Sequence, residues 1–459
     1  MNRTLRILNP ATHKELKKIP MDSPTTIEAK VQKAKRAQPA WAKTPWKTKR
    51  DALVKFDKLL KAEKRPLAKL LSLETGKPIS QALSEVGSVG GRISFFINHA
   101  QRVLSDDTPY KDSSVTETIS YDPLGLVANI SAWNYPYFVG ANVFVPALLT
   151  GNAVLYKPSE FSTLSGLKIA NLLHRAGIPK NIFIPIIGDG RVGAKLIDRP
   201  LGGVFFTGSY ATGTRIAQAV SKRLTRVQLE LGGKDPAYVM EDADPAIAAA
   251  GLADGAFYNT GQSCCAIERI YVHKKVYHRF LEAFVETVRG FRVGDPLDPK
   301  TYIGPLARPQ HLAYLENQTE DAVRKGASLI LGGKRLAKQK GNYFAPTVLT
   351  NCTHRMRVMR EESFGPLIGI QKVSSDAEAI RLMKDTEYGL TAGVYSKKLP
   401  HAKKVLAEMD TGSVYWNCCD RVSPNLPWSG RGHSGIGCTL GVHGISAFLQ
   451  PKAWHLRKA

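Results

Sequence analysis

No stretch of the sequence is apolar for long enough to cross a membrane. A membrane-spanning helix needs about 18 or more consecutive apolar residues. The nearest candidate, residues 135–149, is interrupted by Pro136, Gly140, Asn142 and Pro146. The first ten residues also lack the apolar region of a signal peptide. We therefore expect a cytoplasmic protein.

Cysteine is scarce, with six residues in a chain of 459. Four of them form two adjacent pairs, at positions 264–265 and 418–419, and the others are Cys352 and Cys438. Adjacent cysteines rarely bridge each other, and these spacings fit neither a metal site nor the disulfide framework of a secreted domain. Free thiols and no metal ion are the expectation.

Acidic residues are few relative to basic ones, with 39 Asp and Glu against 64 Lys and Arg and a formal net charge of +25. Much of the excess lies in residues 33–65 and 334–340. Binding to nucleic acid is one interpretation, and a solvated charged face is the other. We favour the second because no aromatic stacking pattern or DNA-binding motif accompanies the lysines. In either case, the positive electrostatic potential of the protein would favour the binding of an anionic dinucleotide.

The chain is long enough for two or three domains, and its 43% of hydrophobic residues is ordinary for a globular enzyme. Residues 1–20 read as a short hairpin, and residues 23–104 carry apolar positions at helical spacing. Residues 105–123 are polar and then alternating, which indicates a projecting ribbon.

Strand and helix patterns then alternate along the chain. A first set of strands is predicted at residues 125–130, 153–156, 182–187, 203–207 and 226–231. A second cycle has strands at 267–273, 343–349, 364–373, 392–395 and 412–417, with helices at 275–288 and 376–383. Such alternation predicts parallel sheets with right-handed crossovers, in which ligands bind beyond the carboxyl ends of the strands.

A carboxylate and a thiol stand out in residues 227–266. Glu230 closes an apolar alternation, and Cys264 follows a Gly-Gln turn 34 residues later. A Glu at a strand end and a Cys on a loop can face each other across a helix of that length. A thiol beside a carboxylate that activates water can form a thioester and then hydrolyse it.

These segments resemble the two signature motifs of the aldehyde dehydrogenase superfamily, Glu-Leu-Gly-Gly-Lys at 230–234 and Gly-Gln-Ser-Cys at 261–264. The resemblance runs from residue 9 to residue 452 and covers six motifs in the family's order. It implies an α/β fold with a Rossmann-like parallel-sheet cofactor domain, a second α/β catalytic domain and a small β oligomerisation element. The implied bounds are 1–106 and 124–229 for the cofactor domain and 230–440 for the catalytic domain. The oligomerisation element would comprise residues 107–123 and 441–459.

The resemblance also assigns catalytic roles. Cys264 would be the nucleophile, Glu230 the general base for water, and Asn134 an oxyanion donor together with the Cys264 backbone N–H. Such donors are commonly worth about 3 kcal/mol each. Cys265 would be structural. Taken alone, these residues read as a buried thiol, a paired carboxylate and a turn residue. The two glycines after Glu230 favour a close backbone approach.

For the cofactor, the expected residues are Ser131, Trp133, Lys157, Ser159, Glu160, Gly208, Ser209, Gly213, Leu231, Glu362 and Phe364. Lys157 and Glu160 would hold the adenine-side ribose, although both also suit a helix N-terminus. A carboxylate there repels a 2′-phosphate, so NAD is favoured and NADP stays possible. The glycines at 206–213 match the family's pyrophosphate site, whereas those at 188–193 read as a tight turn near the adenine. Glu362 would bind the nicotinamide ribose and Phe364 would orient the ring.

Mostly apolar residues are expected to form the substrate pocket, which suits a medium-chain or aromatic aldehyde. They are Tyr135, Phe138, Val139, Asn142, Tyr258, Val422 and Trp428. None of these positions holds the arginine often found in semialdehyde-specific members, which counts against a carboxylate-bearing substrate. Arg421 could still supply that charge.

The predicted function is NAD(P)-dependent oxidation of an aldehyde to a carboxylic acid through a cysteine thiohemiacetal and thioester, in a homodimer or homotetramer. A semialdehyde dehydrogenase using Arg421 and a CoA-acylating relative are the alternatives within enzymes. A catalytically silent, nucleic-acid-binding descendant is the alternative from another class. The presence of Glu230 favours hydrolysis over CoA acylation.

Overall fold

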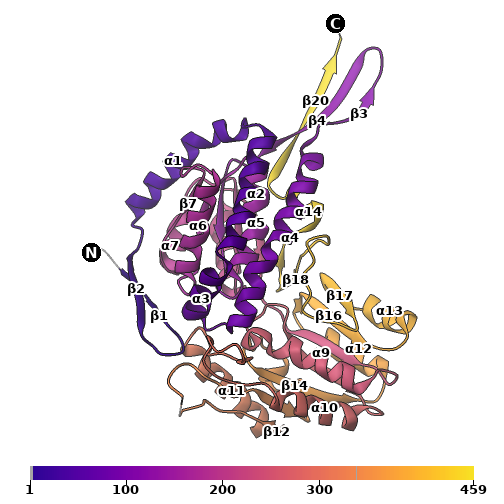
Figure 1. Ribbon diagram of the computed structural model, residues 1–459. Helices are drawn as coiled ribbons and strands as arrows, with labels where there is room; N and C mark the ends of the chain where they lie inside the picture. Colours follow the sequence, from indigo (N-terminus) through magenta and orange to yellow (C-terminus); the bar gives the residue numbers. More distant parts are fainter. Residues whose placement is uncertain (1–3, 338, 459) are drawn as a thin grey trace.

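The computed structural model describes residues 4–337 and 339–458, and it confirms the predicted α/β class (Figure 1). The chain begins with an antiparallel hairpin of β1 (Thr4–Leu8) and β2 (Glu15–Pro20). Four helices follow: α1 (Pro24–Ala42), α2 (Trp46–Ala62), α3 (Lys64–Thr75) and α4 (Ile79–Leu104). Both features were predicted, apart from residues 1–3, which lie outside the described residues.

Local chemistry explains the ends of these helices. The side chain of Ser23 accepts the Thr26 N–H at 3.1 Å, and Pro24 occupies the first helical position, so α1 starts there. Helix α3 ends at Gly76, whose φ of +80° is available to glycine without strain.

The first large sheet has the strand order β19-β9-β8-β5-β6-β7. Its strands are β5 (Leu126–Ile130), β6 (Ala153–Lys157), β7 (Phe183–Pro185), β8 (Gly203–Thr207), β9 (Arg226–Glu230) and β19 (Gly435–Ile436). The linking helices are α5 (Pro136–Leu149), α6 (Thr163–Ala176), α7 (Gly190–Ile197) and α8 (Tyr210–Ser221). Strands β5 to β9 run parallel, as predicted, and every residue of β5 and β6 is buried.

The strand order fixes where a ligand can bind in this sheet. From β5 the chain moves outward through β6 and β7, and it then returns to the other side of β5 for β8 and β9. The connections therefore diverge between β5 and β8. In doubly wound sheets the crevice for ligands opens at that switch point, beyond the carboxyl ends of the strands.

The second large sheet has the order β12-β13-β14-β11-β10-β16-β17. Its strands are β10 (Asp235–Val239), β11 (Ile267–His273), β12 (Ser328–Leu331), β13 (Thr347–Thr350), β14 (Leu367–Val373), β16 (Thr391–Tyr395) and β17 (Ser413–Trp416). Its helices are α9 (Pro245–Phe257), α10 (Tyr277–Arg289), α11 (Gln310–Arg324), α12 (Asp376–Lys384) and α13 (Leu399–Ala407), with short 3₁₀ turns η1 (Tyr258–Gly261) and η2 (Arg357–Met359).

The predicted second cycle is present, but two strand starts were placed too early. Strand β13 begins at Thr347 and β14 at Leu367, each directly after a proline, Pro346 and Pro366. Proline has no N–H to donate to a sheet ladder, so each strand begins beyond it. Strands β10 and β12 and helix α11 were not predicted.

A three-stranded antiparallel ribbon projects from one end of the molecule (Figure 1). It consists of β3 (Asp107–Lys111), β4 (Val115–Pro123) and β20 (Leu449–Arg457), and β20 pairs along the whole of β4. The predicted ribbon and C-terminal tail thus lie side by side, while Ala459 lies outside the described residues. The role of this ribbon in an oligomer remains a prediction.

The chain returns to the first sheet near its end. Gly435 of β19 pairs with Glu230 of β9, and the ring of Phe448 stacks on that of Phe205 at 4.2 Å. Helix α14 (Gly441–Ser446) packs against α4 and α5, and the two-residue strands β15 (Tyr388–Gly389) and β18 (Arg431–Gly432) pair beside β19. The predicted division into domains remains a prediction, but residues 435–440 of the range 230–440 lie with the first sheet. A two-residue strand is too short to leave a pattern in the sequence.

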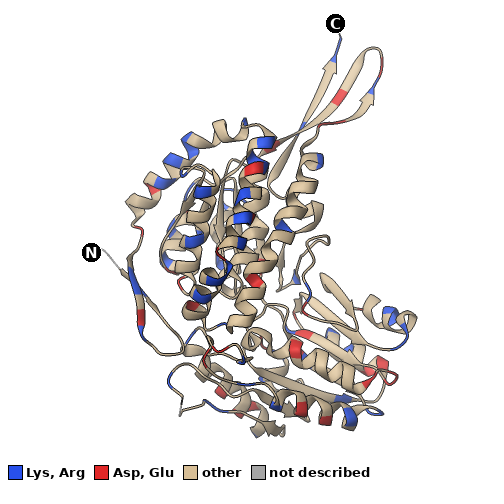
Figure 2. Ribbon diagram, viewed as in Figure 1, with Lys and Arg blue, Asp and Glu red and all other residues tan. Residues whose placement is uncertain are grey.

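Many basic residues of the N-terminal third lie on helices (Figure 2), and most of those on α1 are exposed. In α1, Lys33, Lys35 and Arg36 are exposed, while Val31 and Ala34 are buried against the core. This is the arrangement of a solvated face on an amphipathic helix. Within the described residues, no helix combines the length and the hydropathy that a membrane crossing requires.

Asp235, the first residue of β10, ties two strands of the second sheet together and makes its stability depend on pH. Its carboxyl accepts Thr391 Oγ1 at 2.6 Å and the Thr391 N–H at 3.2 Å, and burial raises its pKa to about 8. Because the folded-state pKa exceeds the unfolded value, its stabilising contribution is lost as the pH rises through about 8.

We expect the melting temperature of Asp235→Asn to fall less between pH 6 and pH 9 than that of the unchanged protein. Thermal melts followed by circular dichroism across this range measure the difference. Parallel declines in the two proteins would contradict the assignment.

Candidate functional site

The carboxyl ends of four parallel strands meet at one edge of the first sheet. Ile130 pairs with Lys157 on one side and Phe206 on the other, and Thr207 pairs with Glu230. The residues that follow these strands are therefore neighbours in space. They include the predicted cofactor residues Ser131, Trp133, Lys157, Ser159, Glu160, Gly208 and Ser209.

At the end of β6, Lys157 is buried and its Nζ lies 3.8 Å from the carboxylate of Glu160. Burial lowers the pKa of this ammonium group. Ser159 Oγ accepts the Phe161 N–H at 3.3 Å, which holds the turn. A Cβ added to Gly193 would contact Lys157 Cδ at 3.4 Å, so the glycine turn at 188–193 packs directly against the lysine.

The N-terminus of α8 faces the switch point between β5 and β8. Ser209 precedes the helix, and its carbonyl accepts the Gly213 N–H at 2.9 Å. A Cβ on Gly213 would contact Leu231 at 2.6 Å, so glycine lets the helix start lie close to the end of β9. The free N–H groups of a first turn attract anions, and this position fits a dinucleotide pyrophosphate.

The loop that carries Cys264 has an unusual backbone. Asn259 and Thr260 adopt φ values of 55° and 61°, which β-branched and most other residues avoid. Hydrogen bonds brace the loop: the Asn259 N–H donates to Gln81 Oε1 at 2.9 Å, and the Ala307 N–H donates to Gln262 Oε1 at 3.0 Å. Cys264 follows this braced turn and is half-buried. Strain held in place by the surroundings is common at functional sites.

Asn134 lies against the thiol loop. Its Nδ2 donates to the carbonyl of Gln262 at 3.1 Å, and Asn259 Nδ2 donates to the carbonyl of Asn134 at 3.2 Å. The end of β5 and the residues just before Cys264 are therefore hydrogen-bonded to each other, and a side-chain amide donor lies beside the thiol loop.

Glu230 is buried at the end of β9. Its Oε1 accepts Gln228 Nε2 at 2.8 Å and Thr439 Oγ1 at 3.3 Å, while Oε2 has no partner among the described residues. Burial raises the pKa of this carboxyl well above its usual value. An acid with a raised pKa and a free oxygen is suited to general-base work on water.

The two glycines after Glu230 bring three segments together. A Cβ on Gly233 would lie 2.9 Å from the carbonyl oxygen of Cys264, and one on Gly232 would clash with the carboxylate of Glu362. The strand end that carries Glu230 therefore touches both the thiol loop and the turn at 361–366.

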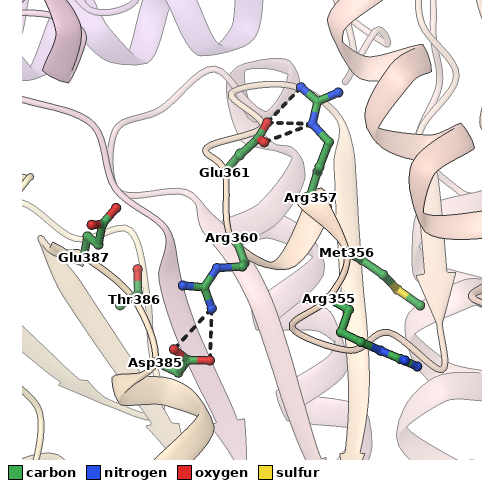
Figure 3. Close-up of a pocket in the computed structure, with 8 residues that line it drawn as sticks. All are labelled: Arg355, Met356, Arg357, Arg360, Glu361, Asp385, Thr386 and Glu387. Carbon is green, nitrogen blue, oxygen red and sulfur yellow. Dashed lines mark hydrogen bonds and ion pairs between the residues drawn. The ribbon is translucent and has the colours of Figure 1, made fainter. Parts of the chain in front are cut away.

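The adjacent acids of that turn face different ways. Figure 3 shows Glu361 turned toward Arg357, whose Nε donates to it at 2.9 and 3.0 Å, in a surface hollow of about 250 Å³. Glu362 instead accepts the Gly233 N–H at 3.2 Å, and burial raises its pKa to about 8. Of the two, Glu362 alone lies beside the Glu230 strand end.

Glu268 holds this turn in place, although no motif around it predicted this role. Its carboxylate accepts the N–H groups of Ser363 and Phe364 at 2.8 and 2.9 Å and pairs with Lys234 at 2.6 Å, in full burial. Phe364 has a φ of 47°, and its ring lies 5.6 Å from that of Trp133 in an edge-to-face contact. The two predicted aromatic residues are thus brought together from segments that adjoin different sheets, because Trp133 follows β5 and Phe364 precedes β14.

Four of the seven predicted pocket residues lie on α5 or directly before it. The rings of Tyr135 and Phe138 stack at 6.2 Å, and the ammonium of Lys77 lies 3.7 Å above Tyr135 while forming an ion pair with buried Glu85. Val139 and Asn142 also lie on α5, and Tyr258 lies just before the thiol loop. Val422 packs against the hydrophobic core around the first sheet. Trp428 exchanges backbone hydrogen bonds with Thr439.

The loop at 417–421 fixes the neighbour of the thiol. Cys265 Sγ donates to Asp420 Oδ1 at 2.8 Å, and Ser263 Oγ donates to the same atom at 3.3 Å. Cys265 is therefore buried and engaged, unlike Cys264. Asp420 was not anticipated, because a carboxylate in a loop about 155 residues downstream has no sequence signal linking it to the thiol.

An arginine also reaches the pocket walls from a direction that sequence reasoning missed. Arg92 of α4 is 7% exposed; its guanidinium lies 3.9 Å above the ring of Phe138, and Nε donates to Asn142 Oδ1 at 2.9 Å. The available signal was an arginine among the buried positions of an amphipathic helix. Arg421, the expected candidate, is exposed, and within the described ranges its side chain donates to a single acceptor, the carbonyl of Asp420.

Comparison with known proteins identifies the family of this chain. The model of the aldehyde dehydrogenase family matches residues 1–454. A betaine aldehyde dehydrogenase of Cereibacter sphaeroides is 35% identical over 451 residues, covering 97% of this chain and 92% of that protein. A 3-sulfolactaldehyde dehydrogenase of Pseudomonas putida is 33% identical over 451 residues, covering 98% and 93%. The crystal structure of an NADP dependent enzyme from E. coli has a TM-score of 0.96 at 32% identity, covering 99% of this chain and 95% of that chain. The chain belongs to the aldehyde dehydrogenase family.

Proposed function

We propose that this protein oxidises an aldehyde to a carboxylic acid with NAD or NADP, using Cys264 as nucleophile. The observation that carries the proposal is the meeting of three segments: the half-buried Cys264, the amide of Asn134 beside its loop, and the Glu230 strand end against the Cys264 carbonyl. Together they supply a nucleophile, an oxyanion donor and a base.

The proposed chemistry begins with the Cys264 thiolate adding to the aldehyde carbon. The Asn134 Nδ2–H and the Cys264 backbone N–H hold the negative charge that develops on the oxygen. A bound nicotinamide dinucleotide would supply the acceptor for the hydride that leaves this carbon, and Cys264 would then hold the oxidised acyl group as a thioester.

Glu230 then removes a proton from water, which attacks the thioester and releases the acid with the thiol restored. The free, buried Oε2 of Glu230 suits this step, because its raised pKa makes it an effective proton acceptor. A CoA-acylating reaction would not need this base, and so the position of Glu230 supports hydrolysis.

The residues present fit a dinucleotide. The start of α8 offers backbone N–H groups for phosphates. Lys157 and Glu160 lie at and just after the end of β6, and Glu362 lies beside Gly232, just after the end of β9. We infer that NAD is preferred over NADP, because the half-buried carboxylate of Glu160 would repel a 2′-phosphate.

Glu160→Gln should lower the preference for NAD by at least about tenfold, since it removes that repulsion and keeps the side-chain size. The ratio of kcat/KM values for the two cofactors, measured with one aldehyde, tests this. Glu28→Gln, on exposed α1, provides the control. An unchanged ratio in Glu160→Gln would refute the inference.

The substrates named for the relatives do not decide the aldehyde. One relative is named for a cationic aldehyde and the other for an anionic one, at nearly equal identity. The test of the proposed function is cofactor reduction in the presence of short, long, aromatic and charged aldehydes. Absence of reduction with every aldehyde and both cofactors would overturn it.

A further inference from the structure

We propose that Arg92 binds an anionic group on the substrate, so that the preferred substrates are aldehydes carrying a carboxylate. This inference rests on the proposed function and names its substrate class. It replaces the uncharged medium-chain or aromatic aldehyde that the pocket sequence favours.

The first observation is that no carboxylate of the described residues forms an ion pair with Arg92. Its side chain is more than nine-tenths buried, yet no carboxylate among the described residues lies within 4.0 Å of it. The nearby acid Glu85 is already paired with Lys77 and accepts the Tyr137 N–H at 3.0 Å. Burial lowers the pKa of Arg92 to about 10, so it remains charged at neutral pH.

The second observation is that most of the guanidinium is unused. Nε donates to Asn142, but Nη1 and Nη2 make no hydrogen bond within the described part of the chain. A buried charge with free donors is costly unless a partner arrives. The planar pair of free nitrogens matches the two oxygens of a carboxylate.

The third observation is location. Arg92 contacts two predicted pocket walls, Phe138 and Asn142, and it is close enough to Cys265 for the thiol to influence its pKa. Cys265 directly follows the proposed nucleophile. The guanidinium therefore lies against the predicted pocket residues of α5 and near the thiol loop.

A surface hollow lies further along α4. It has a volume of about 270 Å³ and is lined by Phe95 and His99 of α4, by Asn425 and Pro427, and by residues 441–443 at the start of α14. Arg92, Phe95 and His99 occupy successive turns on one face of α4. Residues 425–427 follow the loop whose Asp420 accepts the Cys265 thiol. Arg92 and this hollow therefore lie along the same face of α4.

The test compares matched aldehydes that differ only in charge: 4-carboxybenzaldehyde against benzaldehyde, and succinic semialdehyde against butanal. We expect Arg92→Gln, which keeps a donor for Asn142, to lower kcat/KM for the carboxylated member of each pair about 100-fold. The uncharged member should change less than about threefold. Arg92→Lys should recover part of the loss, and Arg102→Gln, exposed on the same helix, should change neither.

An equal loss of kcat/KM on both members would indicate that Arg92 only supports packing. No loss on either member would indicate that Arg92 does not bind the substrate. Each result would overturn the proposal. Binding gives an answer independent of turnover. In the Cys264→Ser protein, calorimetry should find terephthalate bound more tightly than benzoate, and adding Arg92→Gln should abolish the difference. No difference in the first protein would refute the role of Arg92. If no aldehyde is oxidised, the proposed function fails, and this binding comparison still decides on Arg92.

Discussion

Cys264→Ser is expected to lower the steady-state rate of aldehyde oxidation at least about a thousandfold, because a hydroxyl lacks the nucleophilicity of a thiolate in this setting. The half-buried position of Cys264 and the braced turn before it are retained in this variant, so substrate and cofactor should still bind. Cofactor reduction measured spectroscopically gives the rate, and melting temperature checks the fold.

Cys265→Ser is the matched control for this result. Serine at 265 can still donate to Asp420, so activity should stay within about threefold of the unchanged protein. Loss of activity in Cys265→Ser with retention in Cys264→Ser would reverse the assignment of nucleophile.

Glu230→Gln is expected to separate the two halves of the reaction. The first turnover should produce a burst of reduced cofactor, because thioester formation does not use the base. The steady-state rate should then fall about 100-fold or more, in the range that general bases contribute. Rapid-mixing absorbance records both phases, and intact mass spectrometry should detect the acyl group on the protein.

The pH dependence of the steady-state rate provides a second test of Glu230 as the general base. Its pKa is raised by burial, so the base becomes available as the pH rises, and the steady-state rate of the unchanged protein should rise with pH. Glu230→Gln should lose this rise. Glu286→Gln, exposed on α10, is the control. A Glu230→Gln protein that turns over at the normal rate would exclude the role as base.

The sequence predicted the strand–helix alternation of the first sheet well, although it did not reveal every helix of the second, since the 15-residue α11 was missed. The alternating runs before Ser131, Lys157 and Gly208 became the parallel strands of the first sheet, and their ends meet because of the strand order. Strand β10 was missed because it begins with Asp235 and Pro236, which usually mark a loop.

The candidate site was predictable only where a local motif carried it. Glu230, Asn134 and Cys264 each lie in such a motif, and the structure places their segments in contact. Arg92 and Asp420 could not be placed near the site from the sequence, because their contacts with Asn142 and Cys265 join distant parts of the chain.

The late return of the chain to the first sheet has a consequence for biosynthesis. Strand β9 receives its outer neighbour from Gly435–Ile436, and β4 receives its partner from Leu449–Arg457. On the ribosome, therefore, the N-terminal half cannot complete its sheet while the rest is being translated, and its bare strand edges stay open to wrong pairing. Closure of these two edges therefore waits until residues 435–457 have been translated and have left the exit tunnel, and chaperone protection of the nascent chain matters until then.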